Sequence, residues 1–154
     1  MDSTVKEIVA KVKKALDADP TSIVAGEMRN GLPEASCGVA EWDLFLSSVN
    51  GGRFGAFDIW SVEELDMNQV FASVMPGGQH EWLVIGQMIY EPIGLNRTSG
   101  EVVCFAEGRE PIALGSVETF ATDYLLGKAY STVIPNSQQD EWWKVLREAQ
   151  VVED

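Results

Sequence analysis

The stretch from Val39 to Gly52 constrains the fold more than any other part of this sequence. Large apolar side chains recur there at steps of three and four residues, which places them on one face of a helix that must be buried: Val39, Trp42, Phe45, Leu46 and Val49. Asn50-Gly51-Gly52 follows, and these residue types tolerate the left-handed backbone that closes a helix. The pattern predicts a core helix with an Asn-Gly-Gly stop, followed by a strand from Arg53 to Trp60.

Several short motifs follow this helix along the chain. They are Asp58–Leu65, Ile85-Gly86, Gly94–Asn96, Gly100–Val103 and Leu114–Phe120. Together with the helix, they make residues 30–127 resemble the SUKH superfamily, which joins fungal cell-wall synthesis regulators to bacterial immunity proteins. The hallmark of that superfamily is a Trp-containing helix ending in Asn-Gly, matched here by Trp42, Asn50 and Gly51. The resemblance implies that these residues and Gly52 hold the fold. The chain departs from the family by inserting Glu34–Gly38 between Leu32-Pro33 and the helix.

Capping signals and apolar periodicity predict four further helices. They are expected from Thr4 to Leu16, from Ser61 to Val70 or Phe71, from Val117 to Leu125, and from about Ser137 onward. In the Ser61 helix, Val62 and Leu65 face inward, and Gln69 and Val70 are further candidates for the inner face. In the last helix, one apolar face contains Trp142, Val145, Leu146 and Ala149. Trp143 projects from the side of that face, so we expect it to be partly exposed.

Strand signals are concentrated in the middle of the chain. A buried strand is predicted at Trp82–Ile89, and a hairpin at Ile93–Asn96 and Glu101–Ala106 with its turn at Arg97–Gly100. Residues 21–38 are expected to be a connector with at most a short helical piece near Ile23–Met28. The order of elements favours one α+β domain over residues 1–154, with a mostly antiparallel sheet and helices packed on one face.

Charge limits the kinds of partner. The 154 residues include 24 acidic and 11 basic side chains, for a net charge of −13, and four of the basic ones are Lys6, Lys11, Lys13 and Lys14. Such a chain repels phosphate backbones and anionic lipids, so nucleic-acid and membrane binding are not expected. A basic protein partner would suit it, and simple dispersion in solution is the other interpretation.

Chemistry-bearing motifs are sparse. His80 lies in a glycine-rich loop beside Glu81, with no Ser or Cys in a nucleophile motif near it, and Cys37 and Cys104 are expected to be reduced packing residues. No metal-ligand spacing or phosphate-binding loop occurs, so neither a metal nor a cofactor is expected. The carboxylates Glu63, Glu64 and Asp66 are more typical of a charged helix start than of an acid/base pair.

Three classes of function follow. The resemblance implies a non-catalytic immunity protein that neutralises a basic toxin domain, with a nuclease among the candidates. A small acidic secretion chaperone, which would dimerise through a helix, is the alternative, and an enzyme of unknown chemistry is the third. The predicted partner-binding residues are Glu63, Glu64, Asp66 and Trp143. No secretory signal or membrane-length apolar run is found, so the expected location is the cytoplasm.

Overall fold

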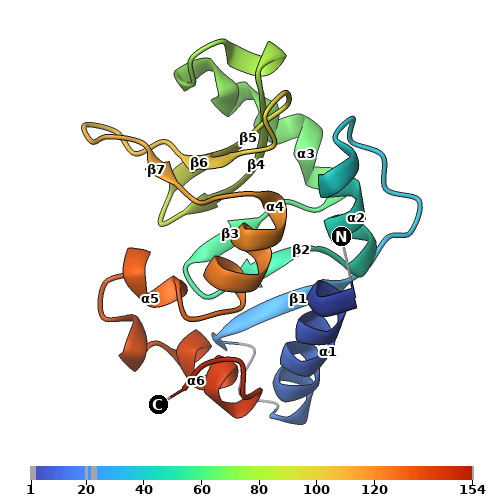
Figure 1. Ribbon diagram of the computed structural model, residues 1–154, viewed down its shortest axis with the longest axis vertical. Helices are drawn as coiled ribbons and strands as arrows, with labels where there is room; N and C mark the ends of the chain where they lie inside the picture. The colour runs from blue at the N-terminus through green and yellow to red at the C-terminus, as the bar shows by residue number, and fades with distance from the viewer. Residues whose placement is uncertain (1–2, 20, 22–23, 154) are drawn as a thin grey trace.

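The computed structural model describes residues 3–19, 21 and 24–153 (Figure 1). Its α-helices are α1 (Ser3–Ala18), α2 (Ala40–Ser48), α3 (Val62–Asn68), α4 (Val117–Thr119), α5 (Tyr130–Val133) and α6 (Glu141–Glu148). Shorter 3-10 segments are η2 (Gln69–Val74), η3 (Gly78–His80) and η5 (Ser137–Gln139), and η4 (Phe120–Leu125) is a π-helical turn that continues α4. The strands are β1 (Gly26–Asn30), β2 (Val49–Phe54), β3 (Phe57–Ile59), β4 (Trp82–Met88), β5 (Glu91–Asn96), β6 (Val102–Cys104) and β7 (Ile112–Ala113). The predicted α+β class is confirmed.

The strands of the described chain form one seven-stranded sheet in which each strand pairs with the next along the sequence. The order is β1 to β7, and every neighbouring pair is antiparallel, so the predicted antiparallel sheet is confirmed. Side chains alternate between the two faces along β4: Leu83 and Ile85 join the main core, whereas Trp82 and Val84 join a smaller one on the other face. Both faces of this part of the sheet are therefore apolar.

The main core lies between the sheet and the helices α1, α2, α4 and α6. Trp42 and Phe45 of α2 stack with ring centroids 4.5 Å apart, and both are fully buried. Trp142 of α6 packs edge-on against Phe54 of β2, with centroids 5.8 Å apart. The first and last helices, α1 and α6, pack side by side at the end of the molecule farthest from η2 (Figure 1). These two helices thereby close the core at the β1 side.

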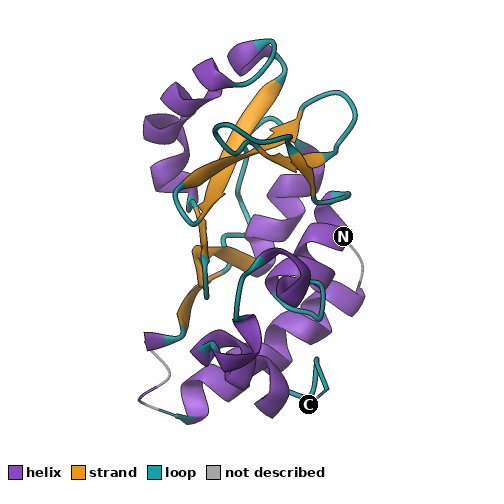
Figure 2. Ribbon diagram, turned by 90° about the vertical axis from the view of Figure 1, so that its left-hand side faces the viewer, coloured by secondary structure: helices purple, strands orange, loops and turns teal. Residues whose placement is uncertain are grey.

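The opposite face is covered over β4–β6 by η2. Ala72 and Met75 pack there against Trp82, Val84 and Val103. In Figure 2 the α3–η2 segment lies on the opposite side of the sheet from α2 and α4. Most helices thus share one face, as predicted, and a short 3-10 segment covers part of the other.

The Asn-Gly-Gly motif lies inside a strand, so the prediction of a helix stop was wrong. α2 ends at Ser48, and Val49 is already extended, with φ −150°. Met28 pairs with Gly52, and Asn30 pairs with Val49, which leaves two residues of β2 opposite one residue of β1. This two-against-one arrangement is a β-bulge, and it bends β2 immediately after α2.

The bulge explains why these residue types are needed. Gly51 has φ +75°, and a Cβ there would lie 2.6 Å from the carbonyl oxygen of Ile59. Gly52 has φ +142°, and its Cβ would lie 2.1 Å from the carbonyl oxygen of Glu27. The side chain of Asn50 accepts a hydrogen bond from the Val62 backbone N–H at 2.9 Å. The motif therefore joins β2 to its two neighbouring strands and to the start of α3.

Two other predictions also need correction. The strand expected from Arg53 to Trp60 is interrupted at residues 55–56, where a turn joins β2 to β3. The connector expected at residues 21–38 contains β1, so the short helical piece predicted near Ile23–Met28 is wrong at residues 26–28. Residue 23 of that predicted piece lies outside the described residues. The hairpin of β5 and β6, the β4 strand and the Ser61–Glu64 capping box are confirmed.

The side chain of Gln69 makes the hydrogen bonds to β4 that a neighbouring strand would otherwise make. β3 pairs with β4 only at residues 86–88, so the backbone of Val84 lies beyond the end of β3. The Gln69 amide accepts a hydrogen bond from the Val84 N–H and donates one to the Val84 carbonyl, both at 2.9 Å. It also donates to the Leu65 carbonyl at 2.8 Å. These bonds anchor η2 on the sheet, which fits the inward position considered for Gln69.

Replacing Gln69 by Leu should lower the free energy of unfolding by roughly 1–3 kcal/mol. Leu keeps most of the volume but leaves both polar backbone groups of Val84 without their side-chain partner. Urea unfolding followed by tryptophan fluorescence would measure the loss. Gln138→Leu is the matched control, because Gln138 is exposed and should tolerate the change. Equal stability of the two variants would contradict the anchoring role.

Candidate functional site

Trp143 is buried, so the prediction that it is partly exposed was wrong, and it offers little surface to a partner. Only 5% of its surface is accessible, and its ring stacks with that of Tyr130, with centroids 6.5 Å apart. Tyr130 belongs to α5, a helix that the sequence did not predict, and α5 covers the side of α6 from which Trp143 projects. The Tyr130 hydroxyl also donates to Asp140 at 2.6 Å, and Asp140 caps α6 by accepting from the Trp142 N–H. This group of contacts is structural.

The three carboxylates predicted at the start of α3 have different surroundings. Glu64 is held in place, because it accepts from the Ser61 backbone at 3.0 Å and from Arg29 at 2.6 Å. Partial burial alone would raise the pKa of the Glu64 carboxyl, but these hydrogen bonds outweigh it and the pKa is lowered. Glu63 and Asp66 are exposed. These two are therefore open to a partner, whereas Glu64 is partly buried.

A row of exposed apolar side chains continues from these carboxylates along α3 and η2. We call it the outward stripe: Met67, Val70, Phe71 and Val74. Met67 is 75% exposed and Val74 is 66% exposed, whereas Ala72 and Met75 supply the inner side of the same segment. Val70, considered for the inner face, is 64% exposed, so that placement was wrong. The spacing of residues 67, 70, 71 and 74 in the sequence predicts that they share one helical face. It does not predict whether that face is buried or exposed.

A second exposed apolar feature is the turn between β4 and β5. Met88 pairs with Glu91, so Ile89 and Tyr90 are the two central residues of a tight hairpin. Their φ angles are +48° and +69°, the left-handed values that a type I′ turn requires and that Asn-Gly adopts most easily. Tyr90 is 86% exposed and Ile89 49%. Two large side chains therefore occupy strained positions where they gain little from packing, a combination that is typical of functional sites.

We call Ile89 and Tyr90 the hairpin tip. The outward stripe and the hairpin tip border one groove. Its volume is about 640 Å³, and it is lined mostly by apolar side chains: Phe71, Val74, Pro76, Tyr90, Glu91, Pro92, Phe105, Ala106, Glu107, Arg109 and Pro111. Isolated exposed apolar residues are common on proteins, but a contiguous apolar surface with a groove marks a place where another molecule binds. The sequence analysis missed this groove because its walls come from three separate segments of the chain.

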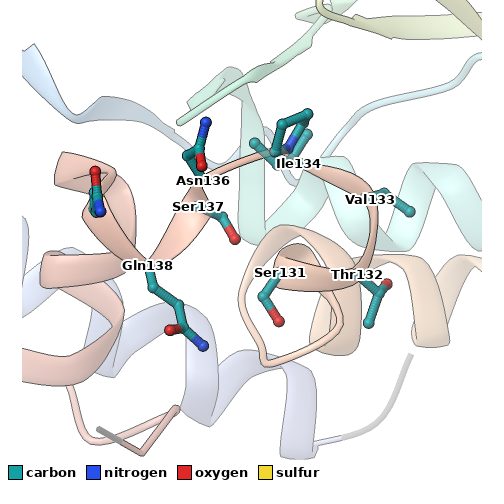
Figure 3. A pocket seen from close by; sticks show the side chains of 9 residues that line it. Ser131, Thr132, Val133, Ile134, Asn136, Ser137 and Gln138 are labelled. Carbon is teal, nitrogen blue, oxygen red and sulfur yellow. The ribbon is translucent and has the colours of Figure 1, made fainter.

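One further hollow and the cysteine and histidine side chains offer little chemistry. A hollow of about 460 Å³ is formed by the single segment 131–139, which contains no ionisable side chain (Figure 3). Burial raises the pKa of the Cys37 and Cys104 thiols to about 11, so neither is an activated nucleophile at neutral pH. His80 is exposed. Within residues 3–19, 21 and 24–153, no three His, Cys, Asp or Glu side chains are grouped to hold a metal ion, and no helix is long and apolar enough to span a bilayer.

The groove, the outward stripe and the hairpin tip are therefore the candidate site, and their features are those of a binding surface. Comparison with known proteins adds no assignment, because no protein-family profile and no curated protein matches this chain.

Proposed function

We propose that this chain is a non-catalytic immunity protein that neutralises a basic toxin domain, such as a nuclease, by binding it directly. The observation that carries the proposal is the exposed apolar surface formed by the outward stripe and the hairpin tip on a strongly acidic chain. Apolar side chains at the centre of an interface supply most of the binding energy, and tyrosine is among the residue types most often found there. The SUKH resemblance supports the same role.

Net charge favours a basic partner over a second copy of the chain. Each molecule carries a formal charge of −13, so two copies repel each other. A toxin that acts on nucleic acid needs a basic cleft, and an acidic protein would be drawn to that cleft from a distance. Light scattering tests this preference, because a stable dimer of the isolated chain would favour the secretion-chaperone alternative.

Reversing the charge of Glu63 and Asp66 to Lys should slow association with the toxin domain. Both residues are exposed beside the outward stripe, and the two swaps change the formal charge from −13 to −9, since each adds two units. The association rate at low salt should fall roughly three- to tenfold, while the dissociation rate changes much less. Glu64 is left unchanged, because its bonds to Ser61 and Arg29 stabilise α3.

The control is the pair Glu148→Lys and Glu153→Lys, which changes the net charge equally at the other end of the molecule (Figure 1). Surface plasmon resonance with a toxin domain encoded beside this gene, at several salt concentrations, would measure both rates. Equal slowing by the two pairs would mean that only total charge matters. Association that is indifferent to salt would remove the electrostatic part of the proposal.

A further inference from the structure

The groove beside Tyr90 is large enough to take a long side chain together with its adjoining backbone. Phe71 projects from η2, Phe105 follows β6, and Pro92 is the second residue of β5, so apolar walls come from both sides. At about 640 Å³ the groove is within the size range of sites that take a small molecule or a few side chains, and it is too small for a whole helix. The expected occupant is therefore a projecting side chain with its adjoining backbone.

Two carboxylates lie in the lining of this apolar groove. Glu91 begins β5 and Glu107 lies in the loop after β6, and the Glu107 backbone N–H donates to the Glu91 carboxylate at 3.2 Å. Among the described residues, neither carboxylate forms an ion pair with a cationic side chain. Arg109 is the one basic residue in the lining, so the acidic groups outnumber it. An apolar slot with unpaired carboxylates favours a ligand that has an apolar stem and a cationic head.

We propose that this groove binds an arginine side chain from the basic partner. Its aliphatic stem would lie along Phe71 and Pro92, and its guanidinium would reach Glu91 and Glu107. Arginine fits better than lysine because its planar head stacks on aromatic rings and binds carboxylates through two parallel hydrogen bonds. This inference rests on the proposed function for the identity of the partner as a basic protein.

The hairpin tip supports the same assignment independently. A two-residue turn can be built from Asn-Gly without strain, yet here Ile89 and Tyr90 hold left-handed angles and place Tyr90 in the groove lining. The Tyr90 ring thereby gives the slot a third aromatic surface beside Phe71 and Phe105. A second copy of this acidic chain is a poorer occupant, because its charge repels the two carboxylates.

The test uses small probes that do not require the toxin. The ¹⁵N-labelled protein is titrated with N-acetyl-arginine methylamide and, separately, with the citrulline analogue, which has nearly the same shape but no charge. The arginine probe should shift the amide signals of residues 90, 91, 93 and 94 and those of residues 105–109. Its dissociation constant should be about five- to tenfold lower than that of the citrulline probe.

Two variants locate the charge effect. In Glu91→Gln/Glu107→Gln the side-chain oxygen of residue 91 can still accept from the residue 107 backbone, so the loop is preserved, and the two probes should bind equally. The control is Glu110→Gln, which removes an exposed carboxylate from the same loop outside the groove lining and should leave the arginine preference intact. Equal binding of the two probes to the parent, or shifts elsewhere on the surface, would overturn the inference.

This experiment separates the inference from the proposed function. If the probes show no arginine preference while the protein still inhibits and binds a basic toxin domain, the arginine slot is wrong and the immunity function stands. If the slot prefers arginine but no basic toxin domain is bound or inhibited, the slot stands and the immunity function fails.

Discussion

Replacing Ile89 and Tyr90 with Asn and Gly is expected to stabilise the fold and to weaken partner binding at the same time. Left-handed backbone angles cost a residue other than glycine roughly 1–2 kcal/mol, and Asn-Gly adopts them readily. Because Tyr90 is 86% exposed, little packing is lost. The free energy of unfolding should rise by about 1–3 kcal/mol, measured by urea denaturation.

The same exchange should weaken toxin binding by roughly 2 kcal/mol or more, which is about thirtyfold in Kd, because it removes the aromatic ring at the groove. Tyr90→Phe is the matched control, since it keeps both the ring and the strained backbone, and both stability and affinity should stay close to those of the parent. Calorimetric titration with the toxin domain gives the affinities. A double variant that is more stable and still binds tightly would show that the hairpin tip is outside the interface.

Truncating Trp42 to Ala is expected to reduce stability by roughly 3–5 kcal/mol, the usual range for a fully buried aromatic side chain. Trp42 is 0% exposed and stacks on Phe45, so its loss opens a cavity beneath α2. Chemical denaturation would show the loss, and binding should decline only as the folded fraction declines. This would be the behaviour of a residue that holds the fold.

Trp42→Phe separates packing from hydrogen bonding. The Trp42 indole N–H is buried and has no hydrogen-bond partner, so removing it leaves no other group unsatisfied. The Phe variant should therefore lose much less stability than the Ala variant. If Trp42→Ala unfolded like the parent but failed to bind, Trp42 would have to be reassigned to the interface.

Local patterns predicted those elements whose signals are local. The helix around Trp42 was predicted because its apolar residues follow one helical period, and the Ser61–Glu64 capping box because both partners lie within one turn. Strand β1 was missed because Gly26–Asn30 has no β-branched residue and is held by pairing with β2. The bulge at Asn50-Gly51 could not be recognised either, because a bulge is defined by the register of the partner strand.

The candidate site was harder to predict than the fold. Val70 was considered for the inner face because it is apolar, whereas the structure places Ala72 and Met75 on the inner side of this segment and leaves Val70 exposed. Trp143 was predicted to be partly exposed because nothing in the sequence of α6 indicates that Tyr130 of α5 covers it. Both errors come from contacts between segments that are distant in the sequence.

The neighbour-to-neighbour order of the sheet has a consequence for how the chain folds during synthesis. Each strand pairs with one that has just been made or is made next, so the strand pairings are local in sequence and the hairpins can form while the nascent chain is still growing. The core under β2 is different, because Phe54 meets Trp142 only after the 87 residues between them have been made. We expect β2 and α1 to acquire their full protection from hydrogen exchange last, once α6 has left the ribosome.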